Sequence, residues 1–336
     1  MAVSPCRTAQ FILKRFGAAA LLLAAGACST PRVAEPGPLR VAVLSDFNSA
    51  YGSTSYEPEV GAAIALVTDE WKPDLVLIPG DMIAGQRPSL TDENVRAMWA
   101  AFDSTVAAPL RRAGIPFAFT IGNHDGSGHP GHERDRRLAR EHWTAPERMP
   151  ELAFVDATAF PFQYAFVLDD VFFLVFDAST GAMAADSAQL DWIRRMLESD
   201  AARTAGARIA LGHVPLYAVA VGRNRPGEVQ AEPDSLRRIL ERGNVGMYIA
   251  GHHHAYYPGR RGELLLFSAG ALGQGPRPLV GSDAEPFKAL TLLTIGPQIR
   301  EQTVGIVGDS VWTVDAESLP AEIEGVNGRV RRVLLR

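Results

Sequence analysis

Residues 117–125 read Phe-Ala-Phe-Thr-Ile-Gly-Asn-His-Asp, an apolar run that ends in a glycine followed by an amide, an imidazole and a carboxylate. A short, continuously apolar run of this kind is typical of a strand that is buried on both faces of a sheet. Ligands of α/β proteins bind at the edge where the strands end. The stretch therefore predicts a buried strand that delivers Asn123, His124 and Asp125 to a functional site.

The same arrangement, an apolar run followed at once by a polar group, occurs four more times along the chain. The runs and the residues that follow them are Val41–Leu44 before Asp46, Leu75–Ile78 before Gly80-Asp81, Ile209–Leu211 before Gly212-His213, and Met247–Ala250 before Gly251-His252-His253-His254. Each piece alone is a weak signal, since a lone Gly-Asp pair or a run of histidines is common. Five in order predict a single site at the ends of five strands.

Segments with helical periodicity separate these runs, which predicts an α/β fold. The helical segments are Glu59–Trp71, Thr91–Arg112, Ser187–Ser199 and Pro233–Arg242. The second half is expected to be richer in strands, with a hairpin at Tyr164–Leu168 and Val171–Phe176 and further strands at Glu263–Phe267, Leu290–Ile295 and Gln302–Val307. Val330–Leu335 is expected to form an edge strand, and Gly126–Leu152 and Pro215–Glu232 to form long loops.

The polar groups at the strand ends have the chemistry of a metal site. Aspartate and asparagine supply oxygen donors and histidine supplies nitrogen, a set that suits Mn, Fe or Zn. Thiolates are excluded, because no cysteine follows Cys28. His252 and His254 are two residues apart, so on an extended segment both side chains would point the same way. His253 would point the other way, to support the site or to face solvent.

The ordered set of motifs, from about Val41 to Ala271, resembles the calcineurin-like metallophosphoesterase superfamily. The resemblance implies a four-layer α/β/β/α sandwich of two mixed β-sheets flanked by helices. It also implies two divalent metal ions, with Asp81 as the bridge between them. By position in the motifs, one metal would be held by Asp46, Asp81 and His254, and the other by Asp81, Asn123, His213 and His252.

The same resemblance implies a hydrolase in which the metals activate water against a phosphate ester. His124 would protonate the leaving group, and Asp125 would orient His124. The substrate would be a small-molecule phosphate ester, and the sequence leaves the choice between monoester and diester open. It also leaves the oligomeric state open.

The first motif departs from the common pattern of the superfamily. Most members have Asp-x-His, whereas this chain has Asp46-Phe47-Asn48. Purple acid phosphatases also lack that histidine and use a tyrosine three residues after the bridging aspartate, where this chain has Ala84. The first metal site would therefore bind metal more weakly, prefer a different metal, or recruit the Asn48 carbonyl, a water or another residue such as Tyr51, although a loop aromatic is the simpler interpretation of Tyr51. The alternative function is a non-catalytic or weakly active lipoprotein that uses the fold to bind a ligand or partner.

Residues in the two expected loops are candidates for substrate contacts. Arg223 and Arg225 have the guanidinium groups that bind phosphate well, although solubilising surface charge is the simpler interpretation. His129, His132 and His142 are expected to be solvated.

The N-terminal segment predicts export and anchoring. A basic start is followed by the apolar run Phe16–Ala27, which is too short to span a bilayer and is typical of a signal peptide. The run ends in Ala25-Gly26-Ala27-Cys28, which resembles the bacterial lipobox. We expect residues 1–27 to be removed, Cys28 to be acylated, and residues 28–38 to tether a metallophosphoesterase domain at 39–336, with a motif core at 41–271 and a strand-rich part at 288–336. The protein would be a membrane-anchored lipoprotein that faces the periplasm, more readily at the outer membrane than the inner.

Net charge argues against one class of partner. The formal net charge is −5, with 33 basic and 38 acidic residues. A nucleic-acid-binding surface requires clustered positive charge. No nucleic-acid partner is expected.

Overall fold

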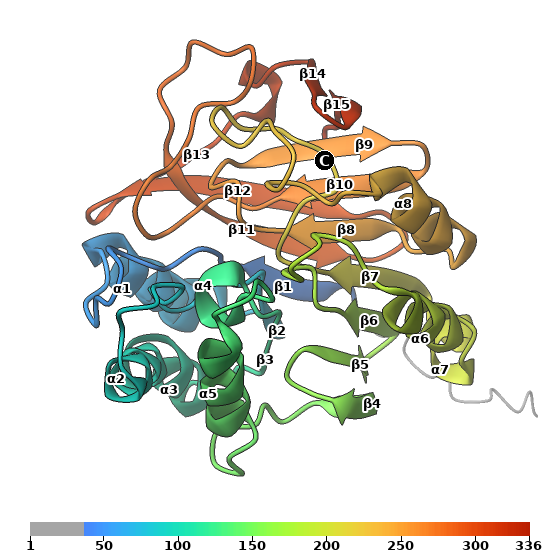
Figure 1. The fold of residues 1–336 in the computed structure, drawn as a ribbon. Coiled ribbons are helices and arrows are strands. Elements are labelled where there is room, and N and C mark those ends of the chain that lie inside the picture. The colour runs from blue at the N-terminus through green and yellow to red at the C-terminus, as the bar shows by residue number, and fades with distance from the viewer. Residues whose placement is uncertain (1–36) are drawn as a thin grey trace, which may run out of the picture. The chain divides into compact units, whose positions relative to one another are not determined.

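The computed structural model describes residues 37–336, so the predicted signal peptide and Cys28 lie outside the described residues. The described part belongs to one unit, Pro36–Arg336. Its two β-sheets, one of six strands and one of nine, are both mixed, and helices flank them (Figure 1). The predicted fold class, an α/β sandwich of two mixed β-sheets flanked by helices, is confirmed.

The six-stranded sheet has the order β13-β12-β11-β1-β2-β3. Its strands are β1 (Leu39–Val43), β2 (Leu75–Ile78), β3 (Phe117–Phe119), β11 (Lys288–Ile295), β12 (Arg300–Val307) and β13 (Ser310–Thr313). β1, β2 and β3 are parallel, while β11 pairs with β1 in the antiparallel direction. The three parallel strands therefore end at one edge, which is the condition for their following residues to meet.

The nine-stranded sheet has the order β14-β15-β9-β10-β8-β7-β6-β5-β4. Its strands are β4 (Ala153–Ala159), β5 (Gln163–Leu168), β6 (Val171–Val175), β7 (Ala207–Leu211), β8 (Met247–Ala250), β9 (Tyr257–Arg261), β10 (Leu264–Ser268), β14 (Glu322–Gly325) and β15 (Gly328–Arg332). β6, β7, β8 and β10 form its parallel centre. β7 and β8 are the two strands whose ends carry histidines.

Two groups of helices lie on different sides of the sheets (Figure 1). The first group is α1 (Pro58–Ala65), α2 (Asp92–Phe102), α3 (Ala108–Arg112), α4 (Asn123–Gly126) and α5 (Glu133–Trp143), and the second is α6 (Ser187–Leu197), α7 (Asp200–Thr204) and α8 (Pro233–Arg242). Two π-helical turns, Leu66–Trp71 and Asp103–Ala107, extend α1 and join α2 to α3. No helix of the described residues is long and apolar enough to cross a membrane.

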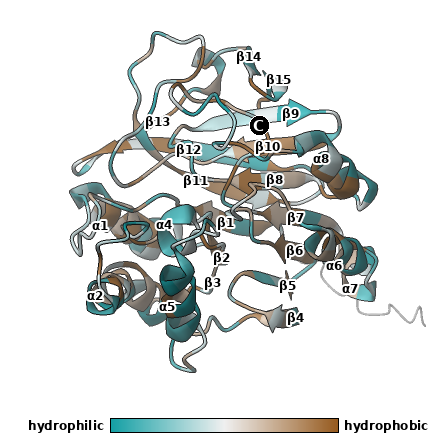
Figure 2. Ribbon diagram, in the orientation of Figure 1, coloured by the Kyte–Doolittle hydropathy of each residue, from teal (hydrophilic) through white to brown (hydrophobic). Residues whose placement is uncertain are grey.

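The core lies between and around the sheets. Figure 2 shows mainly hydrophobic strands near the centre and hydrophilic surfaces on helices such as α5. A cluster of buried aromatic rings anchors α5, because Trp143 stacks on Phe119 of β3 at 4.1 Å between ring centroids. The Tyr164 hydroxyl links the two sheets by accepting a hydrogen bond from the Phe119 amide at 2.9 Å. This packing holds the end of β3 in place, immediately before the polar motif.

Two expectations about the fold are wrong. Gly126–Leu152 is not a continuous loop, because it contains α5, whose buried face includes Leu138, Ala139 and Trp143. The Val330 region is not an edge, because β15 pairs with β9 on one side and with β14 on the other. The edge strand at this end of the sheet is β14, whose short sequence Glu-Ile-Glu-Gly has little β-propensity. Pro215–Glu232 has no helix or strand and is a loop as expected.

Candidate metal centre

The residues that follow β1, β2, β3, β7 and β8 converge, because those strands end at adjoining edges of the two sheets. All are buried, with exposed fractions between 0% and 7%: Asp46, Asn48, Asp81, Asn123, His213, His252 and His254. Backbone contacts tie the loops together, since the His252 amide donates to Asp46 Oδ1 at 3.0 Å. The structure thus brings together Asp46, Asp81, Asn123, His213, His252 and His254, six of the seven residues that the sequence nominated as metal ligands, while Asn48 is buried beside Asp46 in the chain.

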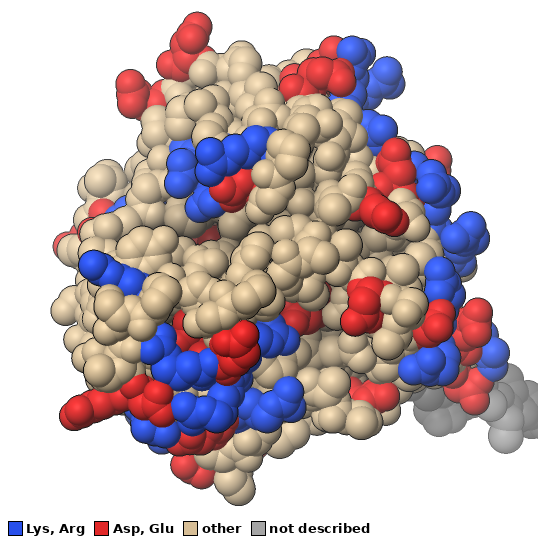
Figure 3. All heavy atoms as spheres, in the orientation of Figure 1, with Lys and Arg blue, Asp and Glu red and all other residues tan. Residues whose placement is uncertain are grey.

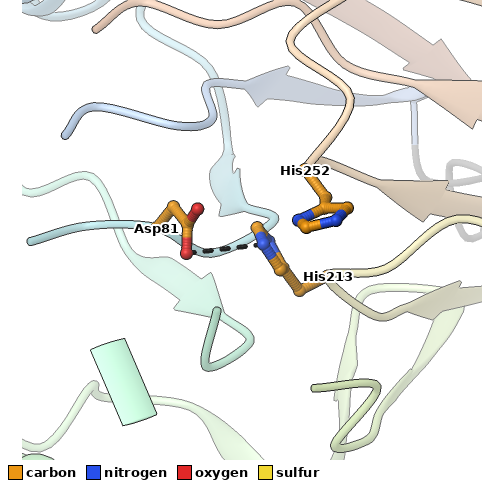
Figure 4. Close-up of side chains that lie close together, drawn as sticks. All are labelled: Asp81, His213 and His252. Atoms are coloured by element: carbon orange, nitrogen blue, oxygen red, sulfur yellow. Dashed lines mark ion pairs between the residues drawn. The ribbon is translucent and has the colours of Figure 1, made fainter. Parts of the chain in front are cut away.

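Within this group, two sets of three side chains place potential ligand atoms within 4.8 Å of one another. One set is Asp81, His213 and His252, shown in Figure 4, where His213 Nε2 lies 3.4 Å from Asp81 Oδ1. The other set is Asp46, Asp81 and His254. Asp81 belongs to both, as a ligand that bridges two metal ions must. The roles of these side chains as metal ligands stay predictions.

Unpartnered atoms show that the residues fit a metal. Buried polar groups normally have hydrogen-bond partners, and leaving one unpaired is costly. His252 Nδ1 and Asn48 Oδ1 are nevertheless buried without one among the described residues, and His254 Nε2 has no hydrogen bond there but lies 3.3 Å from Asp46 Oδ1. All three are metal-donor atoms, and they lie on residues that the motifs assign to the site. The Asn48 atom makes the amide carbonyl a candidate in the position where most of the superfamily has an imidazole.

The backbone at the site is strained at four positions. Asp46, Asp81, His252 and His254 have φ angles of 51°, 52°, 65° and 53°, in the left-handed region that residues with a Cβ rarely adopt. His252 and His254 are therefore not on an extended segment, and the alternation expected from the sequence does not explain their shared direction. Strain of this kind persists at functional sites because the surrounding structure imposes it.

Charges inside the cluster compensate one another. Burial alone would raise the pKa of Asp81, but the neighbouring His213 and His124 hold that pKa far below its usual value. Burial likewise opposes ionisation of Asp46, and His254 lowers its pKa overall. Burial depresses the pKa of His213, but Asp81 outweighs it and raises the pKa to about 9. Both aspartates are thus carboxylates at neutral pH, the form that binds metal.

His124 lies at the margin of the cluster. Its Nε2 is 3.9 Å from Asp81 Oδ2 and its Nδ1 is 3.3 Å from the Gly85 carbonyl oxygen. Burial lowers its pKa below the usual value. The half-exposed ring of Tyr51 lies against it, at 5.1 Å between centroids. Tyr51 is therefore a neighbour of the predicted general acid in this structure.

Asp125 does not orient His124 as the resemblance implied. Its carboxylate instead accepts backbone hydrogen bonds from Met82 and Ile83 at Oδ1 and from Gly122 at Oδ2. These bonds connect the loop after β2 to the loop after β3. Asp125 thus fixes the spacing of the backbone that carries Asp81 and Asn123.

Sequence reasoning missed two polar side chains that contact the predicted ligands. Glu228, in the loop before α8, has Oε2 2.9 Å from His252 Nε2. Gln86 accepts from Asn123 Nδ2 through Oε1 at 2.7 Å. Neither lies in a motif, and each is far in sequence from the ligand that it contacts, 24 residues for Glu228 and His252 and 37 residues for Gln86 and Asn123.

Three other expectations about loop residues have clear outcomes. His142 is buried, not solvated, because it stacks on Trp99 at 4.9 Å. His253 is buried, and its Nε2 lies 2.9 Å from the Glu228 carbonyl oxygen, so it supports the loop beside the site. Arg223 is not simple surface charge, since its side chain is 17% exposed and pairs with Glu228. Arg225 is exposed but pairs with the same carboxylate.

The fold and the site together define a two-sheet α/β protein with a buried centre of carboxylate, amide and imidazole groups suited to metal ions. The chain belongs to the calcineurin-like phosphoesterase family, which it matches over residues 39–256. The family is named for phosphoesterase activity, the hydrolysis of phosphoric ester bonds. No curated protein sequence matches the chain.

Solved structures support the fold. The chain is similar to the purple acid phosphatase PPD1 from yellow lupin (Lupinus luteus) seeds, with 16% identity and a TM-score of 0.61 over 82% of this chain. It spans about half of that protein, 52% of its length. It is also similar to GAP50, the anchor in the inner membrane complex of Plasmodium, with 12% identity and a TM-score of 0.50 over 90% of both chains. At these identities the likeness shows the fold alone.

Proposed function

We propose that this chain hydrolyses phosphomonoesters or phosphodiesters of small molecules at a centre of two divalent metal ions, of Mn, Fe or Zn. The observation that carries the proposal is the pair of buried three-residue sets that share Asp81. Two donor atoms, His252 Nδ1 and Asn48 Oδ1, are buried and unpartnered among the described residues, which costs stability unless a metal binds there. A buried cluster with these donors suits borderline divalent metals.

The ligand sets support one metal at Asp46, Asp81 and His254, with Asn48 as a further oxygen donor. The other metal would be held by Asp81, Asn123, His213 and His252. When bound, two such ions supply a nucleophile at neutral pH and offset charge that develops on the phosphoryl oxygens. The protein itself fixes the ligands through the strained backbone and the hydrogen bonds of Asp125.

His124 is proposed as the general acid that protonates the leaving oxygen. Its ring lies beside Asp81 but is not a member of either three-residue set, which leaves it available to the substrate. Because burial lowers its pKa, its protonated form is confined to more acidic conditions. Hydrolysis of esters with poor leaving groups should therefore increase as the pH falls towards the pKa of His124.

The test uses the full chain, purified and analysed for metal content, with Mn, Zn and Fe added in turn. p-Nitrophenyl phosphate and bis-p-nitrophenyl phosphate report monoesterase and diesterase activity. We expect about two metals per chain and turnover of at least one ester, both lost in Asp81→Asn. One metal or none, without turnover under any metal, would reject the proposal in favour of a non-catalytic binding protein.

We also propose that the chain is exported and anchored in the membrane, facing the periplasm, through acylated Cys28. The short apolar run and the lipobox-like sequence support this. Metabolic labelling with palmitate should label the wild-type chain and not Cys28→Ala. Equal absence of label from both chains would reject the anchor.

A further inference from the structure

Three arginines gather beside the candidate metal centre with one carboxylate between them. Arg223 and Arg225 pair with Glu228, and Arg277 lies on an adjoining loop. Figure 3 shows basic side chains gathered around acidic atoms on the upper part of this face, where Figure 1 draws the loop between β7 and α8. Three positive charges face one negative charge, so the group carries an excess of positive charge.

The loops that carry these arginines are hydrogen-bonded to each other and to the metal-ligand histidines. The Val221 amide donates to the Pro278 carbonyl at 2.9 Å, which joins the two loops. The Arg277 amide donates to the His254 carbonyl at 3.1 Å. Glu228 Oε2 contacts both Arg223 Nη1 and His252 Nε2. The arginines thus hold a defined position against both ends of the His252–His254 segment.

Arg277 lacks the partner that such a group normally has. No hydrogen bond or ion pair within residues 37–336 involves its guanidinium, and its Nε is buried without a partner. The Arg223 Nε is also buried and unpartnered. Burial and then the charge of Arg223 lower the pKa of Arg277. An unpaired, partly buried guanidinium beside two others is costly, and an anion bound there would relieve the cost.

We propose that Arg223 and Arg277 form an anion-binding subsite that takes a second negatively charged group of the substrate. This inference rests on the proposed function, in which the scissile phosphate lies at Asp81. It names the substrate class as phosphate esters whose organic part carries a further phosphate or carboxylate. Guanidinium groups bind either oxyanion through paired hydrogen bonds.

Matched phosphonates test the subsite without turnover. Calorimetric titration of the metal-loaded full chain compares propylphosphonate with 3-phosphonopropionate and propane-1,3-diphosphonate, together with the homologues one carbon shorter and longer. We expect a second anionic group to tighten binding about tenfold, the effect of one charged hydrogen bond, at one or more chain lengths. Whichever terminal group, carboxylate or phosphonate, gives the tighter binding identifies the anionic group that the natural substrate carries.

Arg277→Gln should remove this tightening and leave the affinity for propylphosphonate within about twofold, while Arg277→Lys restores part of it. Arg300→Gln, an exposed arginine of β12, is the control for the same change in net charge and should have no effect. Thermal unfolding checks that each variant is folded. No tightening at any length in the wild type, or tightening that persists in both Arg277→Gln and Arg223→Gln, would overturn the subsite.

Failure of the proposed function would look different. If propylphosphonate itself does not bind the metal-loaded chain, the phosphoesterase proposal fails, and inorganic phosphate then tests the subsite in metal-free protein. Without metals, Asp46 and Asp81 repel phosphate, so binding would be confined to the arginines. Phosphate binding that weakens about tenfold in Arg277→Gln supports the subsite, and binding that is absent or unchanged rejects it.

Discussion

Replacing Glu228 by glutamine should weaken metal binding although Glu228 is not a metal ligand. Burial alone would raise the pKa of Glu228, but hydrogen bonds from His252 and the two arginines hold it well below its usual range. An ionised carboxylate only accepts, so His252 Nε2 must carry the proton that is shared at 2.9 Å. The tautomer leaves Nδ1, the buried unpartnered atom, free to bind metal. Carboxylate–histidine–metal arrangements of this kind both orient the ring and increase its basicity.

The structure sets the size of the effect. Loss of a carboxylate behind a ligating histidine typically costs 10- to 100-fold in metal affinity, or about 1.4–2.7 kcal/mol. Arg223 and Arg225 already share the charge of Glu228, which reduces what His252 gains from it. We therefore expect Glu228→Gln to lower the metal affinity about tenfold, near the lower limit of that range. Glu228→Ala should lower it further, because it removes the hydrogen-bond acceptor altogether.

Competition with a chelating indicator for Zn²⁺ measures the affinity directly, independently of turnover. Glu232→Gln is the matched control, because Glu232 is an exposed acid at the end of the same loop and has no side-chain hydrogen bond in the described residues. The same Glu228→Gln variant should bind phosphonates with a second anionic group more tightly, because one negative charge leaves the arginine group. Zinc affinity within twofold of wild type would refute the role of Glu228.

Four other outcomes are expected. His124→Ala should keep its metal content but lose about 10²- to 10⁴-fold in turnover of esters with poor leaving groups, measured against p-nitrophenyl phosphate, where the loss is smaller; equal losses on both would contradict its role as an acid. Asn48→Ala should bind one metal more weakly in elemental analysis, whereas unchanged stoichiometry and affinity would exclude the Asn48 carbonyl as a ligand. Gly122→Ala should also lose metal, because its methyl group would collide with Asp81; full metal content would show that the loop can yield. Burial raises the pKa of Glu301 from 4.5 to about 7, so the contribution of its protonated form to stability is fully present below pH 4.5 and is lost as the pH rises through 7, by up to about 3 kcal/mol. Glu301→Gln should therefore raise the free energy of unfolding, measured in urea, more at pH 8 than at pH 5. Equal stability of the variant and the wild type at pH 8 would reject the raised pKa.

Much of the site could be predicted from sequence because its residues stand next to strands that sequence identifies well. Leu75–Ile78 and Met247–Ala250 are buried strands with the bounds expected from their apolar runs. Parallel strands end at one edge, so knowing where each run stops was enough to place Asp81 and His252 near each other.

Helices and strands whose sequences mix polar and apolar residues were harder to predict from the sequence. The α5 segment has a strongly charged surface, and its apolar residues are few, so Glu133–Trp143 resembled a solvated loop. The few apolar residues of α5 are recognisable as a buried face only in the folded structure, where Trp143 stacks on Phe119 of β3. The β14 segment was missed because it pairs at the rim of the sheet, where propensity and burial are both weak.

Contacts made by tertiary structure alone were not predictable. Glu228 and His252 are 24 residues apart, and nothing in the local sequence of either one indicates the other. Arg277 likewise lies in a loop with no motif, and its significance comes from the fact that its guanidinium has no partner within residues 37–336. Side chains that support or extend a site depend on loop conformation, which the local sequence constrains least.

The left-handed conformations of Asp46, Asp81, His252 and His254 have an evolutionary consequence. Each costs on the order of 1–3 kcal/mol, and glycine at any of them would relieve the cost while removing a ligand. Drift in a descendant that no longer needed metal would therefore favour glycine or asparagine at these four positions and yield a more thermostable protein. Laboratory selection for heat resistance alone should follow the same route, replacing the predicted metal ligands one at a time by residues that adopt the left-handed conformation at lower cost.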